Sequence, residues 1–180
     1  MDEKVKIALE KQNPWWFDKS FPSGIDRPSY RAAILKYLRT PEILLLVGAR
    51  RTGKSTLLYQ TIHYILKKGK RDSVLFINLD EPLFQSKADD PAFLGDLIAS
   101  CLAERPIKYV FIDEIQNYQY WAQMVKTLYD TQKDLKIILT GSSSTLIHSK
   151  LATRLSGRFF HVRVFPLSFS EYLNFNEIKK

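Results

Sequence analysis

Short apolar runs alternate with more polar stretches along the chain, and five of these runs have the length of a β-strand. Four are almost continuous in apolar residues, namely 43–47, 74–79, 109–112 and, after its first residue, 136–140. Such runs are typical of strands inside a parallel sheet that is buried on both faces. The fifth run, 160–164, alternates apolar and polar residues, which predicts an edge strand with one face in water.

Apolar residues recur at helical spacing between these runs. The segments 30–38, 54–66, 94–102 and 121–128 each place apolar residues three or four positions apart, as amphipathic helices do. Strands that alternate with helices imply right-handed βαβ crossovers and a parallel sheet. We therefore predict an α/β fold with three layers, in which helices cover both faces of a five-stranded, mainly parallel sheet.

The strongest chemical signal follows the first run, where the sequence reads G-x-x-x-x-G-K-[ST], the pattern of a phosphate-binding loop. Glycine lets the backbone bend tightly and approach phosphates closely, and the N-terminus of the next helix favours an anion. Lys54 is placed to reach the β- and γ-phosphates, and the Ser55 hydroxyl is placed to ligate Mg²⁺. The residues predicted to bind the nucleotide are Gly48, Ala49, Arg50, Arg51, Thr52, Gly53, Lys54, Ser55 and Thr56.

Two carboxylates stand at the end of the third run, Asp113 and Glu114. Parallel sheets bind ligands at the carboxyl ends of their strands. We predict that Asp113 holds Mg²⁺ and that Glu114 activates a water as general base. The alternative is a pair of acidic residues that caps the next helix. A small-molecule kinase has less need of Glu114, because its substrate supplies the nucleophile, so the pair favours an ATPase.

Hydroxyl and guanidinium groups complete the predicted site. If the fourth strand lies between the loop strand and the acidic strand, it ends beside the γ-phosphate. In that case we predict Ser142, or as second choice Thr140, as the sensor of the γ-phosphate. Alternatively, these hydroxyls form an N-cap for the segment from Ser144 on. Arg154 and Arg158 are candidates for stabilising transition-state charge, which such a residue can also do from a second subunit. Arg50 and Arg51 add positive charge to the loop or simply face solvent.

Composition narrows the setting of this chemistry. The 180 residues carry 27 basic and 19 acidic residues, a net charge of +8, which permits nucleic-acid binding. The densest basic cluster, 67–71, falls at the predicted end of a helix, where cations also complement the helix dipole. The single cysteine, Cys101, excludes an internal disulfide, and neither a membrane-spanning run nor a secretory signal is present. We expect a cytoplasmic protein with no membrane partner.

Taken together, these motifs resemble the AAA-type core of the archaeal/bacterial ATPase family close to the STAND class of P-loop proteins. The resemblance covers about residues 27–173. It rests on the stretches 48–55, 76–80, 112–116 with Trp121, 138–143, 155–158 and 165–169.

The resemblance implies a P-loop NTPase sheet in the order 5-1-4-3-2, which would place Ser142 between the two phosphate motifs. It also implies that Arg158 is the arginine finger or sensor. A homo-oligomer that supplies an arginine in trans is the partner to consider beside the nucleotide. Family members usually continue into a winged-helix region and often a nuclease-like domain, both absent from this sequence.

We expect the chain to divide into three segments. Residues 1–29 form an aromatic arm, with Trp15 and Trp16, that we expect to be ordered and to pack on the sheet or a neighbouring domain, with stacking over the nucleotide base as the alternative. Residues 30–167 form the AAA-type ATPase domain. The pattern Ser168 to Glu171 is a capping box that opens a helix in 168–180, and we expect the chain to be truncated there.

The main hypothesis is therefore a Mg²⁺-dependent ATPase that binds ATP and ADP. The guanine-reading N-K-x-D pattern is absent, which favours adenine. The alternatives are a nucleotide-gated switch with little turnover, a module whose ATPase responds to DNA, and a P-loop kinase.

Overall fold

The computed structural model describes residues 2–142 and 157–176. Its centre is a five-stranded sheet in the order β2-β3-β4-β1-β5, and every strand pair is parallel. The predicted order is confirmed. The strands are β1 (Ile43–Val47), β2 (Val74–Asn78), β3 (Tyr109–Asp113), β4 (Lys136–Gly141) and β5 (Phe159–Arg163).

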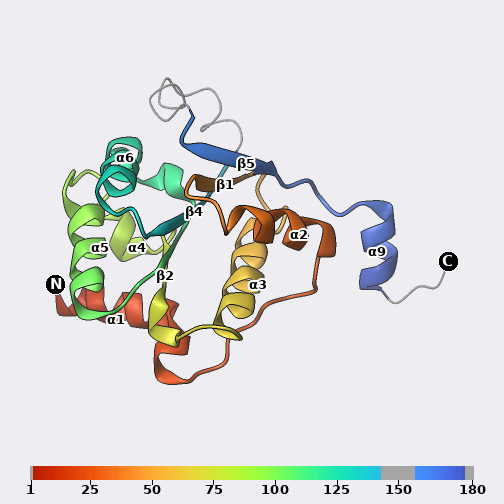
Figure 1. Ribbon diagram of the computed structural model, residues 1–180, viewed down its shortest axis with the longest axis horizontal. Helices are drawn as coiled ribbons and strands as arrows, with labels where there is room; N and C mark the ends of the chain where they lie inside the picture. Colours follow the sequence, from red (N-terminus) through yellow and green to blue (C-terminus); the bar gives the residue numbers. More distant parts are fainter. Residues whose placement is uncertain (1, 143–156, 177–180) are drawn as a thin grey trace.

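Helices cover both faces of this sheet, which gives the three predicted layers (Figure 1). One face is covered by α2 (Pro28–Tyr37) and α3 (Lys54–Leu66). The other face is covered by α1 (Glu3–Gln12), α4 (Pro82–Gln85), α5 (Phe93–Glu104) and α6 (Trp121–Thr131). The remaining helices are η1 (Pro14–Phe17), η2 (Arg71–Ser73), η3 (Ile115–Asn117) and α9 (Phe169–Phe175).

The strands send alternate residues into two separate apolar clusters. In β1, for example, Ile43 and Leu45 join the cluster under α5 and α6, whereas Leu44 and Leu46 join the cluster under α2 and α3. All five residues of β1 are buried, so the continuous apolar run in the sequence reflects burial on both faces. Because β1 is hydrogen-bonded to β4 on one side and β5 on the other, the loop that follows it is held in place at the carboxyl end of the sheet.

The arm ahead of residue 30 packs on the sheet and covers the outer edge of β2. Asn13, which is fully buried, accepts a hydrogen bond from the Phe76 N–H (2.7 Å) and donates one to the Phe76 carbonyl (2.8 Å). The Gln12 amide contacts Asn78 in the same way. The indoles of Trp15 and Trp16 both donate to the Val74 carbonyl, at 3.1 and 2.9 Å. The expected packing of these tryptophans on the sheet is thus confirmed.

The opposite edge strand is β5, as predicted, but both of its faces are only partly covered. Phe160 stacks on Tyr37 of α2, with ring centroids 4.7 Å apart, and is still 39% exposed. On the other face His161 and Arg163 are exposed, whereas Phe159 packs against the apolar cluster under α5 and α6. The predicted capping box opens α9, where the Ser168 side chain accepts from the Glu171 N–H. The division of the chain at 29/30 and 167/168 stays a prediction. No helix in the described part of the chain is long and apolar enough to cross a membrane.

Candidate functional site

Two positions of the loop between β1 and α3 require glycine, for different reasons. A side chain at Gly48 would overlap the Val164 carbonyl oxygen and approach Thr52 Oγ1. Gly53 has φ of +90°, which side chains disfavour. The Thr52 hydroxyl donates to the Ala49 carbonyl at 3.0 Å and so fastens the loop to itself. The first helical residue is Lys54, which places free N–H groups of the helix start beside the loop.

Lys54 is buried inside this loop, with 3% of its surface exposed. Its ammonium donates to the carbonyls of Gly48 (3.2 Å) and Ala49 (3.0 Å) and lies 3.7 Å from Glu114 Oε1. A buried ammonium needs such partners, because burial of an unpaired charge is costly. Phosphate oxygens would compete with these carbonyls for the same three N–H donors.

Asp113 ends β3 beside the loop and is also buried. Burial raises the pKa of this carboxyl, while hydrogen bonds from the hydroxyls of Ser55 and Thr140 and the charge of Lys54 act in the opposite direction. A buried carboxylate next to a hydroxyl offers the hard oxygen ligands that Mg²⁺ prefers, and Mg²⁺ usually takes only one or two protein ligands. Ser55 and Asp113 therefore fit the predicted metal.

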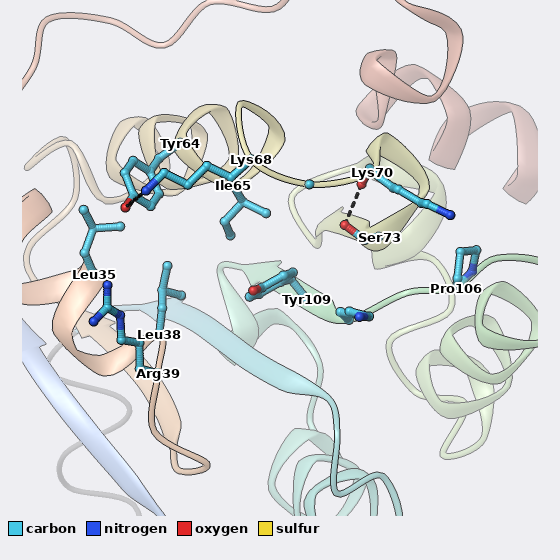
Figure 2. Close-up of a pocket in the computed structure, with 12 residues that line it drawn as sticks. Leu35, Leu38, Arg39, Tyr64, Ile65, Lys68, Lys70, Ser73, Pro106 and Tyr109 are labelled. Atoms are coloured by element: carbon cyan, nitrogen blue, oxygen red, sulfur yellow. Dashed lines mark hydrogen bonds between the residues drawn. The ribbon is translucent and has the colours of Figure 1, made fainter.

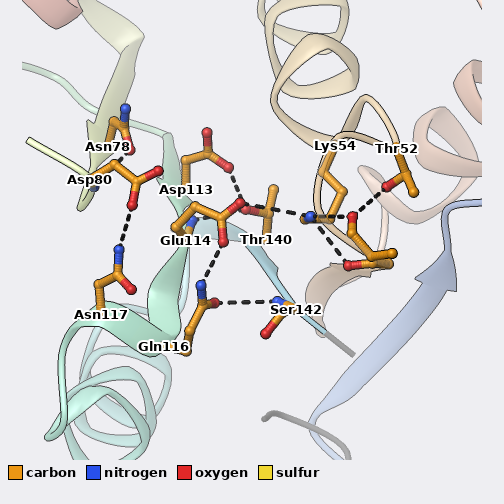
Figure 3. Close-up of polar contacts among 12 residues, drawn as sticks. Thr52, Lys54, Asn78, Asp80, Asp113, Glu114, Gln116, Asn117, Thr140 and Ser142 are labelled. Atoms are coloured by element: carbon orange, nitrogen blue, oxygen red, sulfur yellow. Dashed lines mark hydrogen bonds and ion pairs between the residues drawn. The ribbon is translucent and has the colours of Figure 1, made fainter. Parts of the chain in front are cut away.

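A chain of polar contacts holds Glu114 (Figure 3). Its backbone is left-handed, with φ of 54°, and its N–H donates to Thr140 Oγ1 at 2.9 Å. The same Thr140 hydroxyl donates to Asp113. The Glu114 carboxylate accepts from Gln116 Nε2 at 2.5 Å, and Gln116 Oε1 accepts from the Ser142 N–H at 3.3 Å. Hydrogen bonds thus hold both the main chain and the side chain of Glu114, the candidate base.

The structure brings most of the predicted residues together, but it places Arg158 at the other end of the sheet. Arg50 and Arg51 are exposed. The Arg158 carbonyl accepts from the N–H of Ile43, the first residue of β1, so Arg158 lies one strand length, about 15 Å, from the phosphate loop of its own chain. Its side chain lies 3.5 Å from Asp130. Ser143, Ser144 and Arg154 lie outside the described residues.

Sequence reasoning missed one buried arginine at this site. Arg27, 4% exposed, donates to the Thr52 carbonyl in the phosphate loop at 2.9 Å and to the Phe165 carbonyl at 3.1 Å. It also binds both carboxylate oxygens of Glu171 in α9, at 2.8 and 3.1 Å. This contact lowers the Glu171 pKa to about 2. Neither residue belongs to a binding motif, so only the fold reveals the contact.

The role of Thr140 was also only partly foreseen. The sequence made it the second choice for a γ-phosphate sensor, whereas in the structure its hydroxyl joins Asp113 to the Glu114 main chain. Its position as the fifth residue of β4, beside β3, is the signal that could have indicated this contact. The sensor roles of Ser142 and Thr140 stay predictions.

The loop, the buried lysine and the strand-end carboxylates define a P-loop nucleotide-binding domain. A family model described as an AAA domain matches residues 40–173. The chain therefore belongs to this AAA-domain family and carries an AAA-type P-loop ATPase core.

Similar sequences occur in bacteria and archaea. An uncharacterized protein of Haemophilus influenzae is 32% identical over 151 residues, which cover 83% of this chain and 38% of that protein. An uncharacterized protein of Methanocaldococcus jannaschii is 36% identical over 135 residues, covering 74% of this chain and 29% of that protein. This chain thus spans about a third of the length of these relatives.

Two solved structures support the fold. The Aeropyrum pernix ORC1 protein in complex with DNA aligns with a TM-score of 0.61 at 13% identity, over 87% of this chain and 50% of that one. AMPPCP-bound DnaA from Aquifex aeolicus aligns with a TM-score of 0.52 at 19% identity, over 82% of this chain and 48% of that one. At such identities the likeness concerns the fold alone.

Proposed function

We propose that this domain binds ATP with Mg²⁺ and hydrolyses it. The observation that carries the proposal is the approach of Glu114 Oε1 to within 3.7 Å of the Lys54 ammonium, inside the phosphate loop. A base and a phosphate-binding cation at this separation allow a water to sit between the carboxylate and a bound γ-phosphate.

In the proposed reaction, Lys54 leaves the loop carbonyls and binds the β- and γ-phosphate oxygens. Glu114, oriented by Gln116, accepts a proton from the attacking water as the new bond to the γ-phosphorus forms and the bond to ADP breaks. Ser55 and Asp113 would hold Mg²⁺, which supplies charge neutralisation on the phosphates when bound. Thr140 keeps Asp113 and Glu114 in a fixed relation to each other.

The proposed output is a conformational change that acts on a partner. Arg27 supports a route, because it joins the Thr52 carbonyl in the loop to Glu171 in α9. A change of loop conformation on nucleotide binding would alter this contact and so the position of α9. The proposed partner is DNA or another protein. The ORC1 protein, whose fold is similar, was solved in complex with DNA. We place the protein in the cytoplasm.

A second candidate is a nucleotide-gated switch with little turnover. The observation that favours it is the distance of Arg158 from its own phosphate loop. If a guanidinium is required for fast hydrolysis, it has to come from a second copy, as in NTPases whose arginine acts in trans. A P-loop kinase is less well supported, because Glu114 is held in place next to the loop and a kinase, whose substrate supplies the nucleophile, has less need of such a base.

The test compares phosphate release from Mg-ATP by the wild type, Glu114→Gln and a matched control, Glu104→Gln, whose side chain is exposed at the end of α5. We expect Glu114→Gln to lower turnover at least about 100-fold with ATP binding retained, and Glu104→Gln to match the wild type. Fluorescent-nucleotide binding by Lys54→Ala is measured in parallel and should be weakened.

Each result decides between the candidates. Equal turnover of Glu114→Gln and wild type would overturn the hydrolysis mechanism, and unchanged binding by Lys54→Ala would overturn nucleotide binding at the loop. Tight binding with no turnover by the wild type, even at concentrations that favour a dimer, would favour the switch. Transfer of γ-phosphate to a metabolite instead of water would favour the kinase.

A further inference from the structure

A cavity lined by both charged and apolar side chains lies at the amino ends of the strands, at the end of the sheet away from the phosphate loop. It has a volume of about 580 Å³, within the usual range of ligand pockets, roughly 300–1,000 Å³. Its walls come from the ends of α2 and α3 and from the starts of β2 and β3. Segments far apart in the sequence therefore build it.

Four cations line this cavity: Arg39, Lys68, Lys70 and Lys108. Its lining contains no aspartate or glutamate, and within the described residues none of the four forms an ion pair with a carboxylate. Arg71 and Arg105 nearby are paired instead, with Asp18 and Asp72. The cavity thus collects uncompensated positive charge.

Helix-dipole compensation accounts for only part of this cluster. Lys68 and Lys70 follow the C-terminus of α3, and Arg39 follows that of α2, positions where cations are favourable. Lys108, however, lies in the loop just before β3 and complements no helix end, and it was not part of the cluster 67–71 seen in the sequence. Its convergence on the same cavity indicates a shared anionic ligand.

The floor of the cavity is apolar and aromatic. Leu35, Leu38, Ile65 and Tyr109 line it together with Tyr64. In Figure 2, Arg39, Tyr64 and Lys68 gather at one end, Lys70 lies at the other, and Tyr109 lies between them. The Tyr64 hydroxyl accepts from the Lys68 ammonium at 2.9 Å, and Lys68 and Arg39 both lower the pKa of this hydroxyl.

We propose that this basic cavity binds single-stranded nucleic acid, with phosphates against Arg39, Lys68, Lys70 and Lys108 and an unstacked base against Tyr109. Cationic grooves that track the backbone and aromatic rings that stack with bases are the two features of such sites. A duplex keeps its bases stacked inside and would use the cations alone. The site is distinct from the phosphate loop and does not depend on the proposed ATPase.

The experiment measures fluorescence anisotropy of a labelled 15-mer of deoxythymidine at 50 and 200 mM NaCl. The triple variant Arg39→Ala/Lys68→Ala/Lys108→Ala should bind at least about 30-fold more weakly at low salt. The slope of log affinity against log salt should become less steep by about 2, since each lost phosphate contact removes about 0.7. Tyr109→Leu, which keeps an apolar side chain, should weaken binding about tenfold.

Matched controls separate this site from general charge. Lys4→Ala/Lys6→Ala/Lys11→Ala removes the same charge from exposed positions of α1 on the opposite face and should bind within twofold of wild type. Lys54→Ala should also retain binding, because the phosphate loop lies at the other end of the sheet. Thermal melting of each variant confirms that it is folded.

Four outcomes would overturn the proposal. The first three are wild-type-like binding by the folded triple variant, equal losses in the triple variant and the α1 control, and absence of oligonucleotide binding at 50 mM NaCl. Competition by duplex DNA, inorganic polyphosphate or anionic phosphatidylserine vesicles as strong as by unlabelled single strand would also do so, because it would show a general anion site.

Discussion

The two ends of one sheet use charged side chains in opposite ways. At the carboxyl end, Lys54, Asp113 and Arg27 are buried, and each contacts several partners. At the amino end, the four cavity cations, Arg39, Lys68, Lys70 and Lys108, are exposed and have no carboxylate partner among the described residues. Lys136 beside them is buried and donates to the carbonyls of Thr40 and Glu42. We propose that both ends bind anions, but only the side chains at the carboxyl end are held in place by several partners.

The difference shows how burial changes what a charge can do. A buried charge is stable only with its partners, so each partner at the phosphate loop affects the others and the stability of the domain. Exposed cations act through the sum of their fields, which salt screens. Substitutions at the carboxyl end should therefore alter stability and chemistry together, whereas those at the amino end should alter anion binding alone.

The largest effect on stability is expected for Arg27→Ala. This substitution leaves Glu171 without its ion-pair partner and the carbonyls of Thr52 and Phe165 without the Arg27 donor, and loss of one partner of a buried pair costs about 3 kcal/mol. Urea unfolding should show this loss. Arg27→Lys should recover only part of it, because an ammonium cannot make the same bidentate contact; a loss close to zero would contradict the buried-partner explanation.

Thr140→Val removes the hydroxyl that joins Asp113 to the Glu114 main chain. We expect a loss of about 2 kcal/mol in unfolding free energy, because buried polar groups remain unpaired. We also expect turnover to fall roughly 10- to 100-fold as Glu114 is displaced. Thr140→Ser keeps the hydroxyl and should stay near wild type in both measurements. If Thr140→Val were as active as Thr140→Ser, the positioning role would be wrong.

Glu171 makes stability depend on pH in acid. Its folded pKa, about 2, lies below the ordinary value of 4.5, chiefly because of the hydrogen bond from Arg27. The stabilisation is therefore complete above pH 4.5 and is lost as the pH falls toward 2. Since 20% of the side chain is exposed, screening reduces the effect to about 1 kcal/mol. Glu171→Gln should be less stable at pH 7 but equal to wild type near pH 2 in equilibrium unfolding.

The smallest effect on stability is expected at the amino end. Replacing Arg39 and Lys108 by alanine should shift the melting temperature by no more than about 2 °C, because exposed, unpaired side chains contribute little to folding. ATP turnover should likewise be unchanged. A drop in melting temperature as large as that of Arg27→Ala would mean that these cations have structural partners.

The sequence predicted most of the fold because the continuous apolar runs and the helical spacing each depend on local burial. The phosphate loop and the pair Asp113–Glu114 were also predictable, because the residues of each motif are close together in the sequence. Arg27 and Glu171 are 144 positions apart, and only the folded chain brings them together. The cavity cations arise from three separate segments, of which the sequence showed one.

The amide and indole contacts along β2 have a consequence for the behaviour of many copies in solution. A strand edge with free N–H and C=O groups is a template on which another chain can add a strand, and proteins need some device against it. Here Gln12, Asn13, Trp15 and Trp16 occupy those groups on Val74, Phe76 and Asn78. Residues 12–16 thus guard this edge against pairing with another chain, and detaching them would expose the backbone groups of β2 to strand addition.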